Sequence, residues 1–254
     1  MENKNKIALV TGGSRGLGKD MALRLSEKGL DVILTYNNNE DAAQNVVAQI
    51  EKQGQKAAIL QLNTGDIKSF SSFTERLKDV LTNTFNTNHI DYLINNAGIG
   101  GYSPIANVTE EFFDELMNIH FKGVYFLTQK LLPLINDGGG IVNISSGLTR
   151  VTVPGSSVYA SLKTAVETFT KYLAKELGER KIRANVVAPG AIMTDFGNAH
   201  LRSDEQLQKM VSSVTALGRP GVAEDIGGVV AFLCTEDARW VNGQRIEVAG
   251  GMQL

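Results

Sequence analysis

Three side chains have the types and the spacing needed to move a proton to or from a carbonyl oxygen. Tyr159 and Lys163 are four residues apart in a stretch with helical spacing, so both side chains are expected on one face of a helix, one turn apart. Ser146 ends the apolar run GIVNISS. Its hydroxyl is therefore expected at the carboxyl edge of a sheet, where open α/β folds bind ligands.

These residue types suit a reaction in which hydride moves to a carbonyl carbon. The oxygen then gains negative charge and must receive a proton, which a phenol of lowered pKa can donate. The ammonium of Lys163 and the positive ring of an oxidised nicotinamide would both favour the phenolate of Tyr159. The Ser146 hydroxyl would orient the substrate and stabilise its developing charge. Without a dinucleotide site elsewhere, a surface tyrosine, a solvated lysine and a strand-end serine would be the simpler interpretation.

A glycine-rich turn predicts that dinucleotide site. The run TGGSRGLG (11–18) directly follows an apolar segment and opens a stretch with helical spacing. Glycines there permit positive φ and close approach of the backbone to a pyrophosphate, which the free N–H groups of the helix would bind. A purely structural tight turn is the alternative. The turn residues expected to contact the cofactor are Gly12, Ser14, Arg15, Gly16, Leu17 and Gly18.

The end of the second apolar run indicates which dinucleotide binds. An Asp or Glu there would hold the adenosine ribose, but the sequence reads Thr35-Tyr36-Asn37-Asn38. No acid would repel a 2′-phosphate at Asn37, and Arg15 could supply a cation for it, although Arg15 could equally be a solvated loop residue. The sequence therefore predicts NADP(H) in preference to NAD(H).

Strands and helices alternate along the chain. Short apolar runs bounded by turn residues predict strands buried on both faces, and helical spacing lies between them, for example at 19–29, 41–54 and 157–179. This order predicts an α/β fold in one domain (residues 1–254): a Rossmann-type, doubly wound parallel sheet of about seven strands with helices on both faces. The predicted strands are 6–11, 31–36, 57–62, 91–96, 140–145, 183–188 and 244–249.

Composition excludes several classes of protein. Apolar residues make up 43% of the chain and the net charge is -2, which argues against disorder and against a nucleic-acid partner. No run of apolar residues is long enough for a membrane helix and no export signal is visible, so a cytoplasmic location is expected. The lone Cys234 is expected to be buried. His89 and His200 lack ligand spacing, so no metal site is predicted.

Five motifs in order resemble the short-chain dehydrogenase/reductase family: TGGSRGLG, NNAG (95–98), ISS (144–146), YASLK (159–163) and APGAIMT (188–194). The resemblance covers nearly the whole chain, and the ending VNGQRIEVAGG is similar to the family's last strand. It implies a strand order of 3-2-1-4-5-6-7 and a mobile substrate loop at 195–212. It also implies a homo-oligomer, either a tetramer or a dimer.

The resemblance also assigns cofactor contacts. Asn96 and Gly98 would line the adenine-ribose side, Ile192 and Thr194 would contact the nicotinamide carboxamide, and Lys163 would bind the nicotinamide ribose. The remaining positions implied for the cofactor are Asn63, Ala97, Tyr159, Pro189 and Gly190.

Two positions depart from the family pattern. The family commonly places an asparagine where this chain has His120, and the main chain there holds a water behind the lysine. His120 is therefore a further catalytic candidate: it could serve through its backbone carbonyl, or its side chain could alter the proton relay. Asn118, two residues earlier, is an imperfect substitute. The second departure is Asn63, where the family usually has an aspartate against the adenine.

The function expected on this basis is NADP(H)-dependent interconversion of a carbonyl and an alcohol on a small molecule. One alternative is a catalytically weak, cofactor-binding regulator of the same fold, which only His120 favours. Another is an epimerase or dehydratase of the longer related class, for whose substrate domain 254 residues leave little room. The substrate itself has no readable signature in the sequence.

Overall fold

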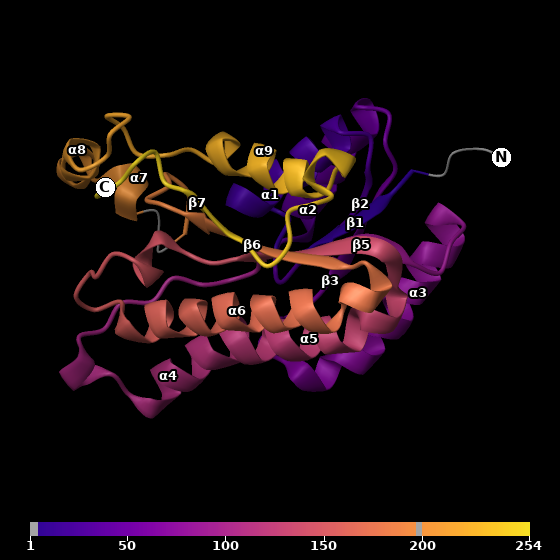
Figure 1. The fold of residues 1–254 in the computed structure, drawn as a ribbon, viewed down its shortest axis with the longest axis horizontal. Coiled ribbons are helices and arrows are strands. Elements are labelled where there is room, and N and C mark those ends of the chain that lie inside the picture. Colours follow the sequence, from indigo (N-terminus) through magenta and orange to yellow (C-terminus); the bar gives the residue numbers. More distant parts are fainter. Residues whose placement is uncertain (1–4, 197–199) are drawn as a thin grey trace.

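A single parallel sheet of seven strands organises the molecule (Figure 1), in the order β3-β2-β1-β4-β5-β6-β7. The computed structural model describes residues 5–196 and 200–254. The predicted fold class and strand order are confirmed. The strands are β1 Ile7–Val10, β2 Asp31–Tyr36, β3 Ala57–Gln61, β4 Ile90–Asn95, β5 Ile135–Ile144, β6 Arg183–Pro189 and β7 Arg245–Val248.

The central strands are rich in apolar residues because both of their faces are buried. In β1, Ile7 and Leu9 pack into the hydrophobic cluster on one side of the sheet, and Ala8 and Val10 pack into the cluster on the other side. Successive side chains of a strand point to opposite faces, so a sheet covered by helices on both sides needs apolar residues at every position.

Helices cover the two faces in separate groups (Figure 1). Helices α1, α2 and α9 lie on one side, and α3, α4, α5 and α6 lie on the other. Helix α2 illustrates how the sequence sets the start of a helix. Asn39 accepts a hydrogen bond from the Ala42 N–H at 2.9 Å, and two acids follow in the first turn. The longer helices are α1 Gly16–Glu27, α2 Glu40–Lys52, α3 Phe70–Phe85, α4 Glu110–Met117, α5 Gly123–Leu131, α6 Ser157–Glu176, α8 Glu205–Ser213 and α9 Glu224–Leu233.

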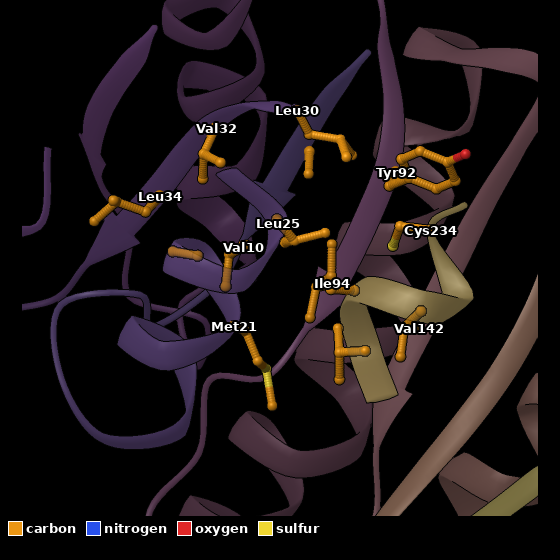
Figure 2. Close-up of a cluster of buried hydrophobic side chains, with 14 of the residues drawn as sticks. Val10, Met21, Leu25, Leu30, Val32, Leu34, Tyr92, Ile94, Val142 and Cys234 are labelled. Atoms are coloured by element: carbon orange, nitrogen blue, oxygen red, sulfur yellow. The ribbon is translucent and has the colours of Figure 1, made fainter. Parts of the chain in front are cut away.

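The core under α1 and α9 includes the lone cysteine (Figure 2). Cys234 is 2% exposed among apolar neighbours, as predicted, and burial raises the pKa of its thiol to about 12. It is therefore a packing residue and not a nucleophile.

Two predicted segments differ from the structure. Strand β5 begins at Ile135, five residues before the predicted start, because Ile135 pairs with Ile90 before the register shifts beside the glycines 138–140. The predicted substrate loop 195–212 contains helices α7 (His200–Ser203) and most of α8. Residues 197–199 of that loop lie outside the described residues.

None of the helices in the described part of the chain is long and apolar enough to cross a membrane. Within the same residues, no group of histidine, cysteine and acidic side chains is arranged to hold a metal ion.

Candidate active site

Strand β5 and helix α6 place the serine, the tyrosine and the lysine together. Ser146 lies just beyond the end of β5, and Tyr159 and Lys163 lie one turn apart near the start of α6. The Ser146 hydroxyl is hydrogen-bonded to the Tyr159 phenol. Lys163 Nζ lies 5.6 Å from the centroid of the tyrosine ring and donates to the Ile144 carbonyl at 2.8 Å. The three side chains singled out by spacing therefore form one cluster.

Burial sets the proton affinities of this cluster. Burial raises the pKa of Tyr159, and the hydrogen bond to Ser146 lowers it by less. Burial also lowers the pKa of Lys163 to about 8. In the protein alone, burial of the phenol outweighs the expected lowering of its pKa by the lysine, whose Nζ is bonded to the Ile144 carbonyl. Tyr159 is thus a neutral phenol at neutral pH, which is the form that can donate a proton.

A row of buried amides and hydroxyls fixes β4, β5 and α6 beneath this cluster. Asn95 Nδ2 donates to Asn143 Oδ1 at 2.8 Å and to Thr128 Oγ1 at 3.0 Å. Asn143 Nδ2 in turn donates to Thr170 Oγ1 of α6 at 2.8 Å. Such a row has few alternative arrangements, because each buried polar group must keep a partner. The helix that carries Tyr159 is therefore held in register with the strand that precedes Ser146.

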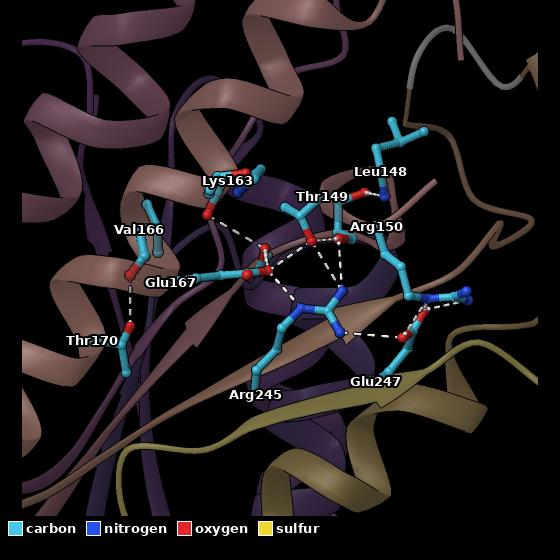
Figure 3. A network of polar contacts seen from close by, with 12 residues as sticks. Leu148, Thr149, Arg150, Lys163, Val166, Glu167, Thr170, Arg245 and Glu247 are labelled. Atoms are coloured by element: carbon cyan, nitrogen blue, oxygen red, sulfur yellow. Dashed lines mark hydrogen bonds and ion pairs between the residues drawn. The ribbon is translucent and has the colours of Figure 1, made fainter. Parts of the chain in front are cut away.

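A second network surrounds the backbone of Ser146 (Figure 3). Glu167 Oε1 accepts hydrogen bonds from Ser145 Oγ at 2.6 Å and from Thr149 Oγ1 at 2.9 Å, and pairs with Arg245 Nε at 2.8 Å. Arg245 Nη2 reaches the Ser146 carbonyl at 3.4 Å, and Thr149 Oγ1 lies 3.0 Å from the same oxygen. Glu167 and Arg245 thus tie the turn after β5 to α6 and β7.

Arg150 and Glu247 extend this network (Figure 3), and Arg150 also reaches the last residues of the chain. Arg150 pairs with Glu247 at 2.9 Å and donates to the main-chain carbonyls of Met252 at 2.6 Å and Gln253 at 2.9 Å. These residues were not predicted from the sequence. Two features of the sequence could have indicated the network. Glu167 lies four residues after Lys163 on the same helix face, and the short final strand contains two charged residues.

His120 lies beside the tyrosine. Its ring meets the Tyr159 ring edge to face, with centroids 4.9 Å apart, and the side chain is completely buried. It occupies a single π-helical turn, Asn118–Lys122, between α4 and α5. The carbonyl of Asn118, the other candidate at this place, accepts the Gly123 N–H in that turn.

The glycine turn has the geometry of a phosphate cradle. Gly12 and Gly16 have φ of 66° and 54°, in the left-handed region that favours glycine. A Cβ on Gly18 would lie 2.2 Å from the Gly12 carbonyl oxygen, so only glycine fits there. Helix α1 begins at Gly16 without a side-chain cap, which leaves its first N–H groups available to an anion. The residues present therefore fit a dinucleotide pyrophosphate.

Two threonines and an asparagine hold this turn in place. Thr35 Oγ1 accepts the Gly12 N–H at 3.1 Å, and Thr11 Oγ1 accepts the N–H groups of Asn96 and Ala97 at 2.9 and 3.0 Å. Asn96 Nδ2 donates to the carbonyls of Thr11 at 2.8 Å and Gly12 at 3.2 Å. The Asn96 side chain thus supports the glycine turn directly, and its place on the adenine-ribose side of the cofactor stays a prediction.

The predicted adenosine-side residues lie at the surface. The Arg15 side chain is exposed and makes no hydrogen bond or ion pair within the described residues. Asn37 is exposed at the end of β2, and the nearest acid, Glu40, is hydrogen-bonded to the hydroxyl of Tyr36. Asn63 Oδ1 accepts the N–H of Gly65 at 2.9 Å. The half-buried Ser14 and Leu17 complete the turn, and Leu17 packs on the core.

The loop after β6 closes the other side of the site. Pro189 ends β6, and Gly190 packs so closely that a Cβ there would lie 2.8 Å from Ala249 Cα. Ile192 bridges to Gly221, and Thr194 faces Gly16, whose ideal Cβ position is 3.7 Å from Thr194 Cβ. The segment predicted to contact a nicotinamide therefore lies across from the glycine turn.

The fold and this site together define a dinucleotide-binding oxidoreductase. The glycine turn lies at the carboxyl edge of β1, and the tyrosine, lysine and serine lie beside it at the edge of β5. Open α/β sheets bind their ligands at that edge, where the strand order reverses.

Comparison with known proteins identifies the family. A family model described as enoyl-(acyl carrier protein) reductase matches residues 12–253. A hydroxynaphthalene reductase-like protein of Metarhizium brunneum is 36% identical over 97% of this chain and 94% of its own length. The reductase LugOII, which catalyses a keto-reduction during lugdunomycin biosynthesis, superposes with a TM-score of 0.93 at 34% identity and full coverage of both chains.

The landomycin ketoreductase LanV, solved with bound NADP and rabelomycin, gives a TM-score of 0.89 at 36% identity, covering 98% of this chain and 96% of its own. This chain belongs to the short-chain dehydrogenase/reductase family of oxidoreductases.

Proposed function

We propose that this protein reduces a ketone on a small molecule to an alcohol with NADPH, and catalyses the reverse oxidation with NADP. The observation that carries the proposal is the cluster of Ser146, Tyr159 and Lys163 beside an uncapped helix N-terminus and glycine turn. The relatives LugOII and LanV, named as a reductase and a ketoreductase, support the same reaction type.

Each residue of the cluster has one task in this proposal. The cofactor, when bound, supplies or accepts the hydride. Tyr159 donates its phenolic proton to the carbonyl oxygen, and Ser146 orients that oxygen by a hydrogen bond. Lys163 is positive at neutral pH with a pKa of about 8, and it binds the nicotinamide ribose and stabilises the phenolate left after proton transfer.

The cofactor would be held by three loops at the same edge of the sheet. The turn 12–18 would bind the pyrophosphate, with Asn37 and Asn63 on the adenosine side. The segment 96–98 would line the cleft between β1 and β4. On the nicotinamide side we propose Pro189, Gly190, Ile192 and Thr194, together with Tyr159 and Lys163.

We expect NADPH to bind more tightly than NADH, and Arg15→Ala to remove most of the difference. Arg15 is an exposed guanidinium without a partner in the described structure, placed at the start of α1, and no acid stands at Asn37 to repel a 2′-phosphate. A charge-assisted hydrogen bond of about 1.5–3 kcal/mol corresponds to roughly ten- to hundredfold in affinity. Competitive titration of the two cofactors measures it, with Lys28→Ala as an exposed-cation control. Equal weakening of both cofactors by Arg15→Ala would contradict the assignment.

Exposed aromatic side chains, one beside Tyr159 and one beside the segment that leads into α6, favour an aromatic ketone as substrate. The ring of Phe196 lies 6.1 Å from that of Tyr159 and is 48% exposed. Tyr102 is 68% exposed and packs its ring against Gly155, two residues before α6. Large aromatic side chains left in water beside a reactive centre are suited to stacking on a flat ring. The names of the hydroxynaphthalene reductase-like protein and of LanV bound to rabelomycin agree with this class.

A panel of ketones tests this substrate class. NADPH oxidation should be faster with a fused-ring aromatic ketone than with an acyclic aliphatic ketone, and Tyr102→Ser should reduce kcat/KM for the aromatic substrate by about two- to tenfold, the value of one aromatic contact. Tyr172→Ser on the outer surface of α6 is the matched control. A Tyr102→Ser effect of the same size on both ketones would count against aromatic stacking.

Three further properties stay proposals. A single domain is supported by the continuous seven-stranded sheet. A homo-oligomer is supported by the exposed aromatic side chains Tyr125 and Phe126 on α5. A cytoplasmic location rests on the sequence alone.

The alternative of a regulator without turnover is disfavoured by the assembled serine, tyrosine and lysine.

A further inference from the structure

His120 is a buried titratable side chain to which the proposed reaction assigns no task. Its imidazole is 0% exposed, and it makes two close contacts with the backbone of Ile99. His120 Nε2 lies 2.8 Å from the Ile99 carbonyl oxygen and 3.3 Å from the Ile99 nitrogen. Ile99 directly follows the segment 96–98, which holds the glycine turn. The imidazole is therefore bonded to a loop of the cofactor site, not merely packed between helices.

The contacts of the two ring nitrogens assign the tautomer. The shorter contact is to the carbonyl, so Nε2 carries the proton and donates it to Ile99. Nδ1 is buried and has no hydrogen-bond partner within the described residues. Burial, together with repulsion from Lys163, lowers the pKa of His120 to about 3. The ring is accordingly neutral, and no described residue is a second hydrogen-bond partner to which it could pass a proton.

The absence of a side chain at residue 98 makes room for this ring. A Cβ on Gly98 would lie 2.7 Å from His120 Cε1 and 3.3 Å from its Nδ1, and the next nearest atom, the Asn96 carbonyl oxygen, would be 3.8 Å away. Gly98 does not need a positive φ, because it is absent from the positive-φ residues of the chain. Within the protein itself, glycine is required at 98 because of the imidazole.

We propose that His120 is a positioning residue that holds the Gly98–Ile99 backbone against the ring of Tyr159. His120 contacts both the tyrosine and the loop. Its ring centroid lies 4.9 Å from that of Tyr159 in an edge-to-face arrangement, and its Nε2 is hydrogen-bonded to Ile99. Describing Gly98–Ile99 as part of the cofactor site rests on the proposed function. The hydrogen bond of His120 to Ile99 and its ring contact with Tyr159 are independent of the proposed function. A measurement on the protein without cofactor therefore distinguishes the positioning role from the proposed function.

The test is a double-mutant cycle on Gly98 and His120. Gly98→Ala should weaken NADPH binding by roughly five- to 150-fold, because overpacking costs about 1–3 kcal/mol. His120→Asn should weaken it by about tenfold or less, with an unchanged pH profile. In the double variant the clash is gone, so its affinity should match that of His120→Asn alone. Thermal unfolding of the four proteins should show the same rescue. Additive effects in both measurements would overturn the proposal.

Two further measurements distinguish a specific contact between Gly98 and His120 from a general effect of added side-chain volume. Gly13→Ala, whose Cβ would lie 2.6 Å from Leu34 Cβ, produces a clash that His120→Asn should not relieve. In the wild-type protein, ¹⁵N NMR of the histidine side chains should show His120 as the Nε2–H tautomer throughout pH 5–9, read without any cofactor. A protonated ring or the Nδ1–H tautomer would overturn the proposal. If the rescue appears in thermal unfolding while NADPH does not bind at all, the proposed function fails and the positioning contact stands.

Discussion

Replacing Tyr159 with phenylalanine is expected to reduce turnover by about 10² to 10⁴, the usual contribution of general acid catalysis, with little change in NADPH affinity. The substitution removes one hydroxyl and keeps the ring that meets His120 edge to face and lies under Lys163. No other phenol or carboxyl hydrogen-bonds Ser146 in the described structure, so no neighbour could replace the lost acid. Steady-state kinetics and a cofactor titration on the same preparation measure both quantities.

The matched control is Tyr172→Phe, which removes a hydroxyl from an exposed tyrosine on the same helix. It should leave turnover unchanged. If Tyr159→Phe keeps activity within a fewfold of wild type, the phenol is not the proton donor and the assignment of the cluster is wrong.

Gly18→Ala is expected to weaken dinucleotide binding by about five- to 150-fold, the equivalent of about 1–3 kcal/mol of overpacking. The added Cβ would lie 2.2 Å from the Gly12 carbonyl oxygen and 2.5 Å from Asn96 Nδ2. Both groups are fixed by the hydrogen bonds of the turn, so the clash must displace the backbone that would cradle the pyrophosphate. Fluorescence titration of NADPH measures the change.

Gly228→Ala provides the comparison, because Gly228 is also a helical glycine but a Cβ there would meet nothing within 4 Å. It should leave binding unaltered and stabilise the fold by about 0.5–1 kcal/mol. Equal binding losses in the two variants would show that helix propensity, and not the turn, controls affinity.

The fold was predictable because one pattern repeats along the chain. Most strands contain successive apolar residues, as in Ile7–Val10, and every strand before β7 is followed by a helical stretch, which leaves few topologies other than a covered parallel sheet. The start of β5 was missed because the residues 136–140 read as a turn, whereas their pairing depends on β4, far away in sequence. The helices within 195–212 were missed because the resemblance implied a loop there.

Spacing also predicted the cluster of Ser146, Tyr159 and Lys163, because a helix places residues four apart on one face. It could not predict proton affinities: the pKa of Tyr159 is raised by burial, which depends on the complete packing around α6. The Glu167–Arg245 pair was missed for a similar reason, since its partners are 78 residues apart and meet only through the sheet.

The central claim is that hydride passes between a nicotinamide cofactor and a carbonyl carbon at Tyr159. The most direct measurement is isotope transfer: NADPH labelled with deuterium at the transferable position is incubated with the protein and a fused-ring aromatic ketone, and the alcohol is analysed by mass spectrometry and NMR. The account predicts one deuterium on the carbinol carbon, formed in proportion to the NADPH oxidised, and almost none with Tyr159→Phe. Oxidation of NADPH without label in the alcohol, or equal labelling with the Tyr159→Phe variant, would contradict it.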